Sequence, residues 1–476
     1  MKVSLVYPPF LNSIQTTLPE FVDENEGFFH PLGILYVASY LKRYNRDCDV
    51  QVIDAVAEKL TYGQISERLA GFAPDLVGIS CWTFSLIDSL KVAELVKKNI
   101  PGARVCLGGP HVTIYPAETV SFDCVDFVIT GDGEKSFSEL VLRLSRGGDP
   151  EDVPNIYYKR NSRVEKGKSS YTETHLDDLP FPDRTLVPLK NYFSIIDKDK
   201  PITTMITSRG CPFKCKFCFQ QGTGWRYRNI PGIIAEMEHC VSLGIKNFFI
   251  FDETFTVNKE RIIKLCDEIK IRKLDITWSC RSRVDTIDEE MMDKLKEAGC
   301  DRISFGVESA NDEVLRLLNK KIRISRVREV FKLAKKKKLV TLADFMIGCP
   351  GENKAVTLET IKLALDLDPD YVQFTLLTLF PATELYEEAL KRGIVKNDVW
   401  LDYARNPTTA FRPPIWNIYS EEEAKRLLAY SYRKFYLRLS YIFKRMACLG
   451  SFREFKRYAK AGFCLIGYLF RIPANR

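Results

Sequence analysis

The sequence lacks any apolar run long enough to cross a membrane. A membrane helix needs about 18–20 continuous apolar residues, and the nearest candidate, residues 461–470, falls well short. The first nine residues also lack the long apolar stretch and small-residue cleavage site of a signal peptide. Disorder is excluded as well, because hydrophobic residues make up 45% of the chain and charged residues 28%. These absences predict a globular cytoplasmic protein.

The basic charge is confined to the C-terminal part of the chain. The formal net charge is +8, but residues 425–476 hold 13 Lys and Arg against one acidic residue, Glu454. That stretch carries +12, and residues 1–424, with 57 basic and 61 acidic side chains, carry −4. A length of 476 residues predicts two to four domains at about 150 residues per domain.

Residues 1–148 alternate β-branched runs with amphipathic stretches, which predicts parallel strands joined by helices. The expected strands are 3–7, 50–53, 76–80, 105–107 and 127–130. This order is typical of a doubly wound sheet of the Rossmann or flavodoxin type, whose ligands bind at the carboxyl ends of the strands. Glycines follow two of these strands, and they allow a bulky ligand to approach the backbone.

A second series of alternating strands and helices follows a connecting segment. Prolines and a polar run predict this linker, with one hairpin, over 149–200. Six strand candidates then fall within 201–395, at 203–207, 247–251, 276–279, 302–306, 341–347 and 371–377. Six units predict a partial TIM-type (β/α)6 barrel with its active site at the carboxyl ends of the strands. Residues 396–476 are expected to be mainly helical.

Three cysteines follow the first strand of this series. Cys211, Cys215 and Cys218 are spaced C-x3-C-x2-C, and Lys214 and Lys216 lie between them. Thiolates are the ligands of iron–sulfur clusters. Zinc is the main alternative, but its sites usually need a second ligand pair, and the four histidines of the chain supply no obvious one. Packed free thiols are a poorer explanation for so polar a loop.

This motif, with an aromatic residue before its last cysteine, resembles the radical S-adenosylmethionine (SAM) superfamily over residues 200–390. The resemblance implies a [4Fe–4S] cluster whose open iron binds SAM and whose electron cleaves it to a 5′-deoxyadenosyl radical. It assigns the cluster, as catalytic and metal ligands, to Cys211, Cys215 and Cys218. It assigns SAM contacts to Phe217, Asp252, Glu253, Arg281 or Arg283, Glu308 and Gly348. Many relatives have Pro-Gly-Thr where this chain has Pro-Ala-Thr at 381–383.

The N-terminal region resembles the cobalamin-binding domains of one large radical SAM class. The resemblance implies cobalamin contacts at Ser80, Gly108, Gly109, Gly131, Gly133 and Glu134. The D-x-H-x-x-G signature of B12 domains with a histidine ligand to cobalt is absent, and the nearest histidine, His30, has different surroundings. Many radical SAM relatives share this absence. His111, after a Gly-Gly-Pro turn, is expected to start a helix and is not a candidate axial ligand.

The resemblance implies a cobalamin-dependent C-methyltransferase that methylates an unactivated carbon. One alternative is radical cyclisation, oxidation or rearrangement, with or without cobalamin. Another is a non-catalytic protein that binds metal or nucleic acid. No motif identifies the substrate, and a small molecule or a lipid-like compound would fit. Flavodoxin or ferredoxin is the expected type of electron donor.

The basic C-terminal stretch has three interpretations. Its 12 aromatic residues lie among the basic ones, a composition that suits a peripheral membrane contact. It equally suits helices packed on the acidic body of the enzyme, which is the favoured interpretation. Nucleic-acid binding is the third, since charge alone supplies non-specific affinity, and it is the least expected.

Overall fold

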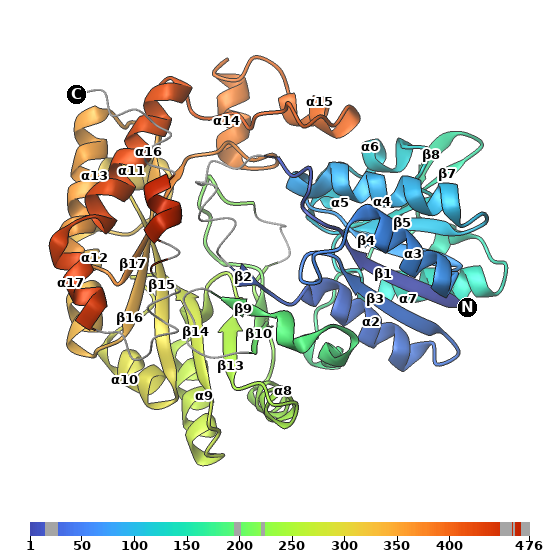
Figure 1. Ribbon diagram of the computed structural model, residues 1–476, viewed down its shortest axis with the longest axis horizontal. Coiled ribbons are helices and arrows are strands. Elements are labelled where there is room, and N and C mark those ends of the chain that lie inside the picture. Colours follow the sequence, from blue (N-terminus) through green and yellow to red (C-terminus); the bar gives the residue numbers. More distant parts are fainter. Residues whose placement is uncertain (15–26, 195–200, 220–223, 448–458, 460–461, 468–476) are drawn as a thin grey trace. The chain divides into compact units, whose positions relative to one another are not determined.

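The computed structural model describes residues 1–14, 27–194, 201–219, 224–447, 459 and 462–467. The chain forms two compact units. The N-terminal unit comprises the described parts of 1–15, 28–192 and 397–412, and the barrel unit comprises the remaining described residues. Residues 397–412 thus follow the barrel in sequence but belong to the N-terminal unit. Figure 1 shows both units, coloured along the chain.

The N-terminal unit is built on a seven-stranded sheet of order β3-β1-β4-β5-β6-β7-β8. The first five strands are parallel, and β7 and β8 are antiparallel. The strands are β1 (Lys2–Tyr7), β3 (Asp49–Asp54), β4 (Leu76–Ser80), β5 (Arg104–Gly108), β6 (Phe127–Ile129), β7 (Ile156–Arg160) and β8 (Arg163–Lys166). The five strands expected from the sequence are all present. The hairpin of β7 and β8 lies in the segment 149–200, and it extends the sheet.

Helices cover both faces of this sheet. They are α2 (Leu32–Tyr44), α3 (Tyr62–Phe72), α4 (Leu86–Asn99), α5 (Pro110–Ile114), α6 (Pro116–Ser121) and α7 (Glu134–Ser145). Helix α2 packs beside α7, and α3 packs beside α4. Close packing explains Gly78 in the central strand, because a Cβ there would lie 2.6 Å from Leu5 and 3.0 Å from Phe137. The doubly wound fold class is therefore confirmed.

The barrel unit contains six parallel strands in the order β10-β13-β14-β15-β16-β17. They are β10 (Ile202–Met205), β13 (Asn247–Ile250), β14 (Thr277–Ser282), β15 (Cys300–Glu308), β16 (Val340–Ile347) and β17 (Tyr371–Leu376). In this strand order β10 and β17 are the two edges. The sheet is therefore a partial barrel, as expected, and its active-site end is the carboxyl end of the strands.

Six helices follow the strands of this unit in sequence, and several of them pack on the outer face of the sheet (Figure 1). They are α8 (Ile230–Ser242), α9 (Lys259–Ile271), α10 (Glu289–Glu297), α11 (Asp312–Leu317), α12 (Ile324–Lys336) and α13 (Lys354–Leu367). All except α12 begin at an Asn or Asp whose side chain accepts a hydrogen bond from a backbone N–H of the first turn. Phe305 of β15 packs on Phe331 of α12 with ring centroids 5.5 Å apart. Because side chains alternate along a strand, the neighbours of Phe305 face the inner side.

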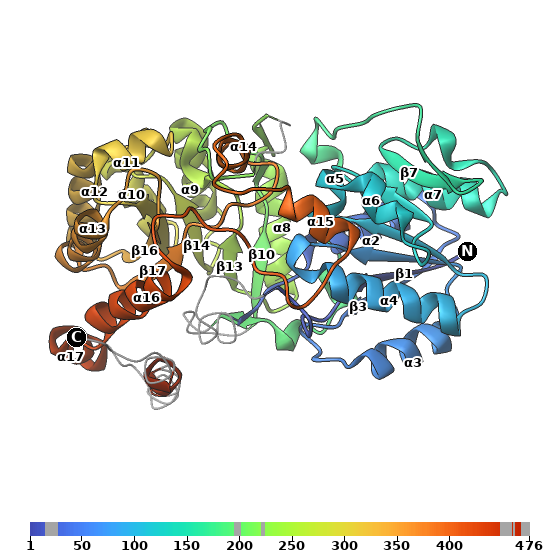
Figure 2. The ribbon, with the colours of Figure 1, turned by 90° about the horizontal axis from the view of Figure 1, so that it is seen from above.

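The C-terminal helices pack on the open edge of the barrel. Helix α16 (Glu421–Tyr436) lies against β17 (Figure 2). The Tyr432 hydroxyl accepts from the Phe374 N–H at 3.2 Å and donates to the Phe374 carbonyl at 3.0 Å. One helical turn later, the Tyr436 hydroxyl makes the same pair of bonds with Val372, at 3.0 and 2.7 Å. The two hydroxyls therefore take the place of a neighbouring strand along this edge.

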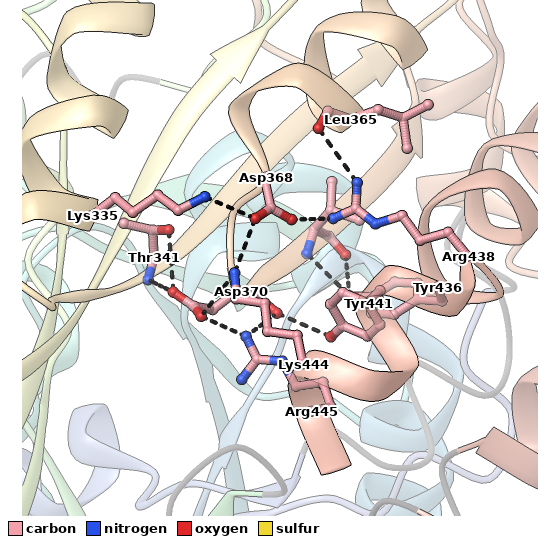
Figure 3. A network of polar contacts seen from close by, with 11 residues as sticks. Lys335, Thr341, Leu365, Asp368, Asp370, Tyr436, Arg438, Tyr441, Lys444 and Arg445 are labelled. Atoms are coloured by element: carbon pink, nitrogen blue, oxygen red, sulfur yellow. Dashed lines mark hydrogen bonds and ion pairs between the residues drawn. The ribbon is translucent and has the colours of Figure 1, made fainter. Parts of the chain in front are cut away.

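Helix α17 (Leu439–Ala447) adds ion pairs to this contact (Figure 3). Arg438 and Lys444 bind Asp368, and Arg445 lies 2.5 Å from Asp370. Although burial opposes ionisation, hydrogen bonds from lysines lower the pKa of Asp368. This part of the basic stretch therefore packs on acidic residues of the barrel unit, as favoured from the sequence. None of the helices in the described parts of the chain is long and apolar enough to span a bilayer.

We expect Tyr432→Phe to destabilise the protein by about 1–3 kcal/mol, because the buried N–H and carbonyl of Phe374 would each lose a partner. Urea unfolding of the variant and the wild type measures the difference. Tyr430→Phe is the control, since Tyr430 lies on the same helix with an exposed side chain. Equal unfolding midpoints for the two variants would contradict the role of the hydroxyl.

Candidate active site

A loop between two short strands carries the three cysteines. The chain leaves β11 (Ser208–Arg209) and returns through β12 (Arg226–Tyr227), which pairs with it in antiparallel register. Within the loop the Lys216 N–H donates to the Leu318 carbonyl at 3.0 Å. The cysteines therefore follow the first barrel strand, and a main-chain hydrogen bond attaches their loop to the barrel.

Lys216 fixes the same loop through its side chain. Its ammonium group lies 3.2 Å from Glu384 and 3.3 Å from Glu388, both on α14 (Glu384–Lys391). The Leu385 N–H donates to the Lys216 carbonyl at 2.9 Å. This lysine, which the sequence marks only as a polar residue of the loop, positions the cysteines. The spacing of the cysteine motif does not predict this role, because the glutamate partners of Lys216 are about 170 residues away in sequence.

The three thiols form no disulfide, and they lie close enough to influence one another. Cys211 and Cys215 are half-buried and Cys218 is exposed. Burial and the neighbouring thiols Cys215 and Cys211 raise the pKa of Cys218 to about 11. Within the described residues no three His, Cys, Asp or Glu side chains form a site for one metal ion. An iron–sulfur cluster instead binds each thiolate at a separate iron, and this donor set fits such a cluster.

A buried arginine lies beside the cysteine loop. The Arg283 guanidinium stacks on Phe213 at 3.8 Å and donates to the Cys215 sulfur at 3.6 Å. It also donates twice to Asp285, at 2.9 and 2.8 Å, and to the Lys320 carbonyl at 2.6 Å. Its hydrogen-bonding capacity is therefore largely used. Arg283 places positive charge next to a thiol, where it favours the thiolate.

Two adjacent carboxylates after β13 have different environments. Asp252 is fully buried and accepts from the Thr207 N–H at 2.7 Å and from the Thr207 and Ser208 hydroxyls at 2.6 Å each. These bonds connect the end of β13 to the segment that enters the cysteine loop. Glu253 is exposed and lies near the backbone of Gly210. Of the two, Glu253 has the more accessible carboxylate for an ammonium group.

Glu308 ends β15 in a constrained position. Its φ is 69°, in the left-handed region, and its carboxylate lies 2.7 Å from the Lys320 ammonium, with both side chains buried. A Cβ on Gly306 would lie 2.7 Å from that ammonium and closer still to the carboxylate, so a side chain there would displace this ion pair. Non-glycine residues adopt this conformation at a cost, and such positions cluster at functional sites.

The loop after β16 is closed by a carboxylate. Glu352 accepts from the N–H groups of Gly348 and Cys349 at 2.5 and 2.7 Å, and from the Thr357 hydroxyl at 2.8 Å. Gly348 has a φ of 84°, and no atom lies within 4 Å of the place of its Cβ. The backbone at Gly348 is therefore shaped by Glu352 and open on the side where a side chain would stand.

Arg281, near the end of β14, has free donors. Its guanidinium lies 4.6 Å from the Phe251 ring and 5.4 Å from the Phe249 ring. It is exposed and forms no hydrogen bond or ion pair with any residue in the described parts of the chain. Phe217 is half-buried, 5.9 Å from the Lys320 ammonium.

The alanine at position 382, where many relatives have glycine, has a structural consequence. Ala382 has a φ of 55°, a conformation that costs an L-residue roughly 1–2 kcal/mol and costs glycine little. The glycine expected from the resemblance would suit this turn better. Thr383 nevertheless caps α14, because its hydroxyl accepts from the Tyr386 N–H at 3.2 Å.

The predicted cobalamin contacts lie at the carboxyl ends of three adjacent strands. Ser80 ends β4 and Gly108 ends β5, and the two are register partners. Gly109 has a φ of 117°, and a Cβ there would lie 2.8 Å from the Cys81 carbonyl oxygen. Gly131 and Gly133 follow β6 and have no atom within 3.7 Å of the place of a Cβ. Glu134 is buried at the start of α7. This glycine-rich edge fits a large ligand.

Comparison with known families supports the assignments of both the N-terminal unit and the barrel unit. The model of the radical SAM superfamily matches residues 205–364, and the model of the B12 binding domain matches residues 21–141. An uncharacterized methyltransferase of Pyrococcus horikoshii, PH0819, is 35% identical over 93% of this chain and 94% of its own length. An anaerobic magnesium-protoporphyrin IX monomethyl ester cyclase of Rubrivivax gelatinosus is 29% identical over 77% of this chain and 67% of its own.

Two solved structures share the fold. The cobalamin-dependent SAM radical enzyme OxsB, with aqua-cobalamin and SAM bound, matches with a TM-score of 0.74 over 98% of this chain and 72% of its own, at 16% identity. The radical SAM methyltransferase TsrM of Kitasatospora setae matches with a TM-score of 0.65 over 82% of this chain and 75% of its own, at 18% identity. The two family models and the 35% identical relative show that the chain belongs to the radical SAM superfamily, in the class that carries a B12-binding domain ahead of the barrel in sequence.

Proposed function

We propose that the protein is a cobalamin-dependent C-methyltransferase that methylates an unactivated carbon of a small molecule. One observation carries the proposal: a cysteine loop that fits an iron–sulfur cluster and a B12-type sheet with a glycine-rich edge occur in one chain. Three relatives named as methyltransferases support it. They are PH0819 of P. horikoshii, the 26% identical cytidylyl-2-hydroxyethylphosphonate methyltransferase of Streptomyces wedmorensis, and a bacteriochlorophyllide methyltransferase of Chlorobaculum tepidum.

In this proposal Cys211, Cys215 and Cys218 hold a [4Fe–4S] cluster. When bound, the cluster supplies the electron that cleaves SAM to a 5′-deoxyadenosyl radical. Glu253 accepts a hydrogen bond from the SAM ammonium group, since charge-assisted bonds of this kind are strong. Arg281 offers its free guanidinium to the carboxylate, because Arg283 is already bound to Asp285.

The other SAM contacts follow from the strand ends. Glu308, held in place by Lys320, accepts hydrogen bonds from the ribose hydroxyls. The open backbone at Gly348 borders the adenine, and Phe217 and Asp252 support the loop from within. In the N-terminal unit the edge from Ser80 to Glu134 would hold cobalamin, which supplies a methyl group to a substrate carbon radical. The protein's part is to position these groups and to keep water away from the radical.

Radical cyclisation is the second candidate. The anaerobic magnesium-protoporphyrin IX monomethyl ester cyclases of R. gelatinosus and Cereibacter sphaeroides are 29% and 26% identical to this chain. Methylation adds a carbon to the substrate and cyclisation does not, so the mass of the product separates the two. For the electron that reduces the cluster in either reaction, we propose flavodoxin or ferredoxin as donor.

The cluster assignment predicts the effect of removing its ligands. We expect the variant with Cys211, Cys215 and Cys218 all changed to Ala to lose the absorbance of the cluster after anaerobic reconstitution, and to form no 5′-deoxyadenosine from SAM under strong reductant. Cys124→Ala is the control, because Cys124 is a half-buried free thiol of the N-terminal unit. A triple variant that still cleaves SAM would overturn the assignment.

The methyl transfer predicts a compound that is missing when the gene is deleted. We expect metabolite and lipid extracts of the deletion strain to lack one species and to gain its precursor, lighter by one methylene. Feeding methionine with a deuterated methyl group should label the missing species in the wild type. A mass change of two hydrogens with no added carbon would favour cyclisation instead.

For localisation we propose a peripheral membrane contact through α17. Its side chains Leu439, Ile442, Phe443 and Met446 are 71%, 37%, 66% and 56% exposed, and their spacing places them on one face of the helix. The opposite face binds the barrel through Tyr441, Lys444 and Arg445. An exposed apolar stripe in a basic stretch suits the interface of an anionic bilayer.

The membrane contact predicts flotation with lipid vesicles. We expect the wild type to float with vesicles of phosphatidylglycerol and not with vesicles of phosphatidylcholine, and we expect Leu439→Glu with Phe443→Glu to abolish flotation. Leu358→Glu, at an exposed leucine of α13, is the matched control. The contact would be refuted if the wild type did not float, or if the double variant floated as well as the wild type.

A further inference from the structure

Each nitrogen of the Arg283 guanidinium group has an acceptor. Nε and Nη2 donate to the two carboxylate oxygens of Asp285 at 2.9 and 2.8 Å, and Nη2 also donates to the Lys320 carbonyl at 2.6 Å. Nη1 donates to the Cys215 sulfur at 3.6 Å and has no other acceptor in the described parts of the chain. Because a two-point bond to a carboxylate fixes the plane of the guanidinium, Nη1 is held in the direction of this sulfur.

Contacts from two segments keep this cation beside the cysteine loop. Phe213, a residue of that loop, stacks on the guanidinium with its ring centroid 3.8 Å away. The turn that binds Arg283 through Lys320 is itself bonded to the loop, since the Leu318 carbonyl accepts from the Lys216 N–H at 3.0 Å. Arg283 is 5% exposed, so these contacts are protected from competition by water.

The sulfur acceptor distinguishes Arg283 from an arginine that only pairs with a carboxylate. A neutral thiol is a weak acceptor, whereas a hydrogen bond from a cation to a charged acceptor is about twice as strong as one between neutral groups. The buried Nη1 donor therefore gains most when Cys215 is a thiolate, which is the form that binds iron. In a buried position the charge of Arg283 is also screened less than at the surface.

A cation beside an iron–sulfur cluster acts most strongly on the reduced state. Reduction adds one electron, and the added negative charge strengthens both the hydrogen bond to the thiolate sulfur and the attraction to the guanidinium. Hydrogen bonds to the sulfurs and the net charge are among the factors that set the reduction potential. The reduced form is therefore stabilised relative to the oxidised form, and the potential rises.

We infer that Arg283 raises the reduction potential of the cluster through its hydrogen bond to Cys215 and its charge. The inference rests on the proposed function, because it takes a [4Fe–4S] cluster on Cys211, Cys215 and Cys218. The step concerned is the transfer of one electron, in which the flavodoxin or ferredoxin is oxidised, the cluster is reduced, and no bond forms or breaks. Arg283 acts through Cys215 and is therefore a positioning residue, whereas Arg281 offers its guanidinium to SAM.

Arg283→Gln removes the charge and should lower the potential. The full-length protein is reconstituted anaerobically without SAM, and the midpoint potential is measured in a redox titration followed by the electron paramagnetic resonance of the reduced cluster. We expect a fall of about 59 mV or more, which is a tenfold change in the equilibrium for one electron. Arg326→Gln is the matched control and should keep the wild-type potential, because Arg326 is half-buried and donates to the Val284 carbonyl at 3.1 Å, next to Asp285.

Asp285→Asn should shift the potential in the opposite direction. It removes a negative charge and leaves the stack on Phe213 and the bond to the Lys320 carbonyl to hold the guanidinium, so we expect the potential to rise. The rise should be smaller than the fall in Arg283→Gln, because the Asp285 side chain is 31% exposed and its charge is screened by water and salt. A disturbance of the loop alone would not give two shifts of opposite sign.

The outcomes separate this inference from the proposed function. A wild-type potential in Arg283→Gln, at equal iron and sulfide content, would overturn the inference and leave the cluster assignment intact. Equal shifts in Arg283→Gln and Arg326→Gln would overturn it as well. If Arg283→Gln takes up no cluster, Asp285→Asn decides, and a potential that falls or stays unchanged in that variant overturns the inference. A wild type that takes up no cluster would overturn the proposed function with it.

Discussion

An open sheet of parallel strands has an edge whose peptide groups lack partners, and the barrel unit depends on how that edge is satisfied. Closing a barrel with eight strands removes the edge but fills the interior with side chains. Here six strands leave the inner face accessible, and the hydroxyls of Tyr432 and Tyr436 bond the outward peptide groups of β17. A hydroxyl can donate and accept at once, so one tyrosine serves both groups of a residue.

The packing of the C-terminal helices on this edge also accounts for part of the charge distribution along the chain. Asp368 and Asp370 precede β17, and they are balanced by Arg438, Lys444 and Arg445. These three basic residues therefore neutralise acidic residues of the barrel unit. Composition alone shows the excess of positive charge in this stretch but not its partners, because the pairs are separated by 70 residues or more.

The sequence predicts the architecture well, because strand, helix and cysteine spacing are local signals. All eleven expected strands of the two sheets are present. It predicts less of the site, where contacts join distant elements. Asp252 and Glu253 look equivalent in sequence, yet one is buried under three hydrogen bonds and the other is exposed. The Lys320 ammonium beside Glu308 comes from a loop with no recognisable motif.

The return of residues 397–412 to the N-terminal unit is the clearest example of information that no local pattern carries. Aromatic residues such as Trp400 and Tyr403 indicate burial, but the sequence does not say against which unit they are buried. Because this segment lies between the last barrel strand and the helices that cover its edge, it connects the chain of the barrel to the B12-type sheet. The packing of Trp400 and Tyr403 on Phe411 and the ion pair of Arg405 with Glu118 therefore hold the segment that leaves the barrel on the N-terminal unit.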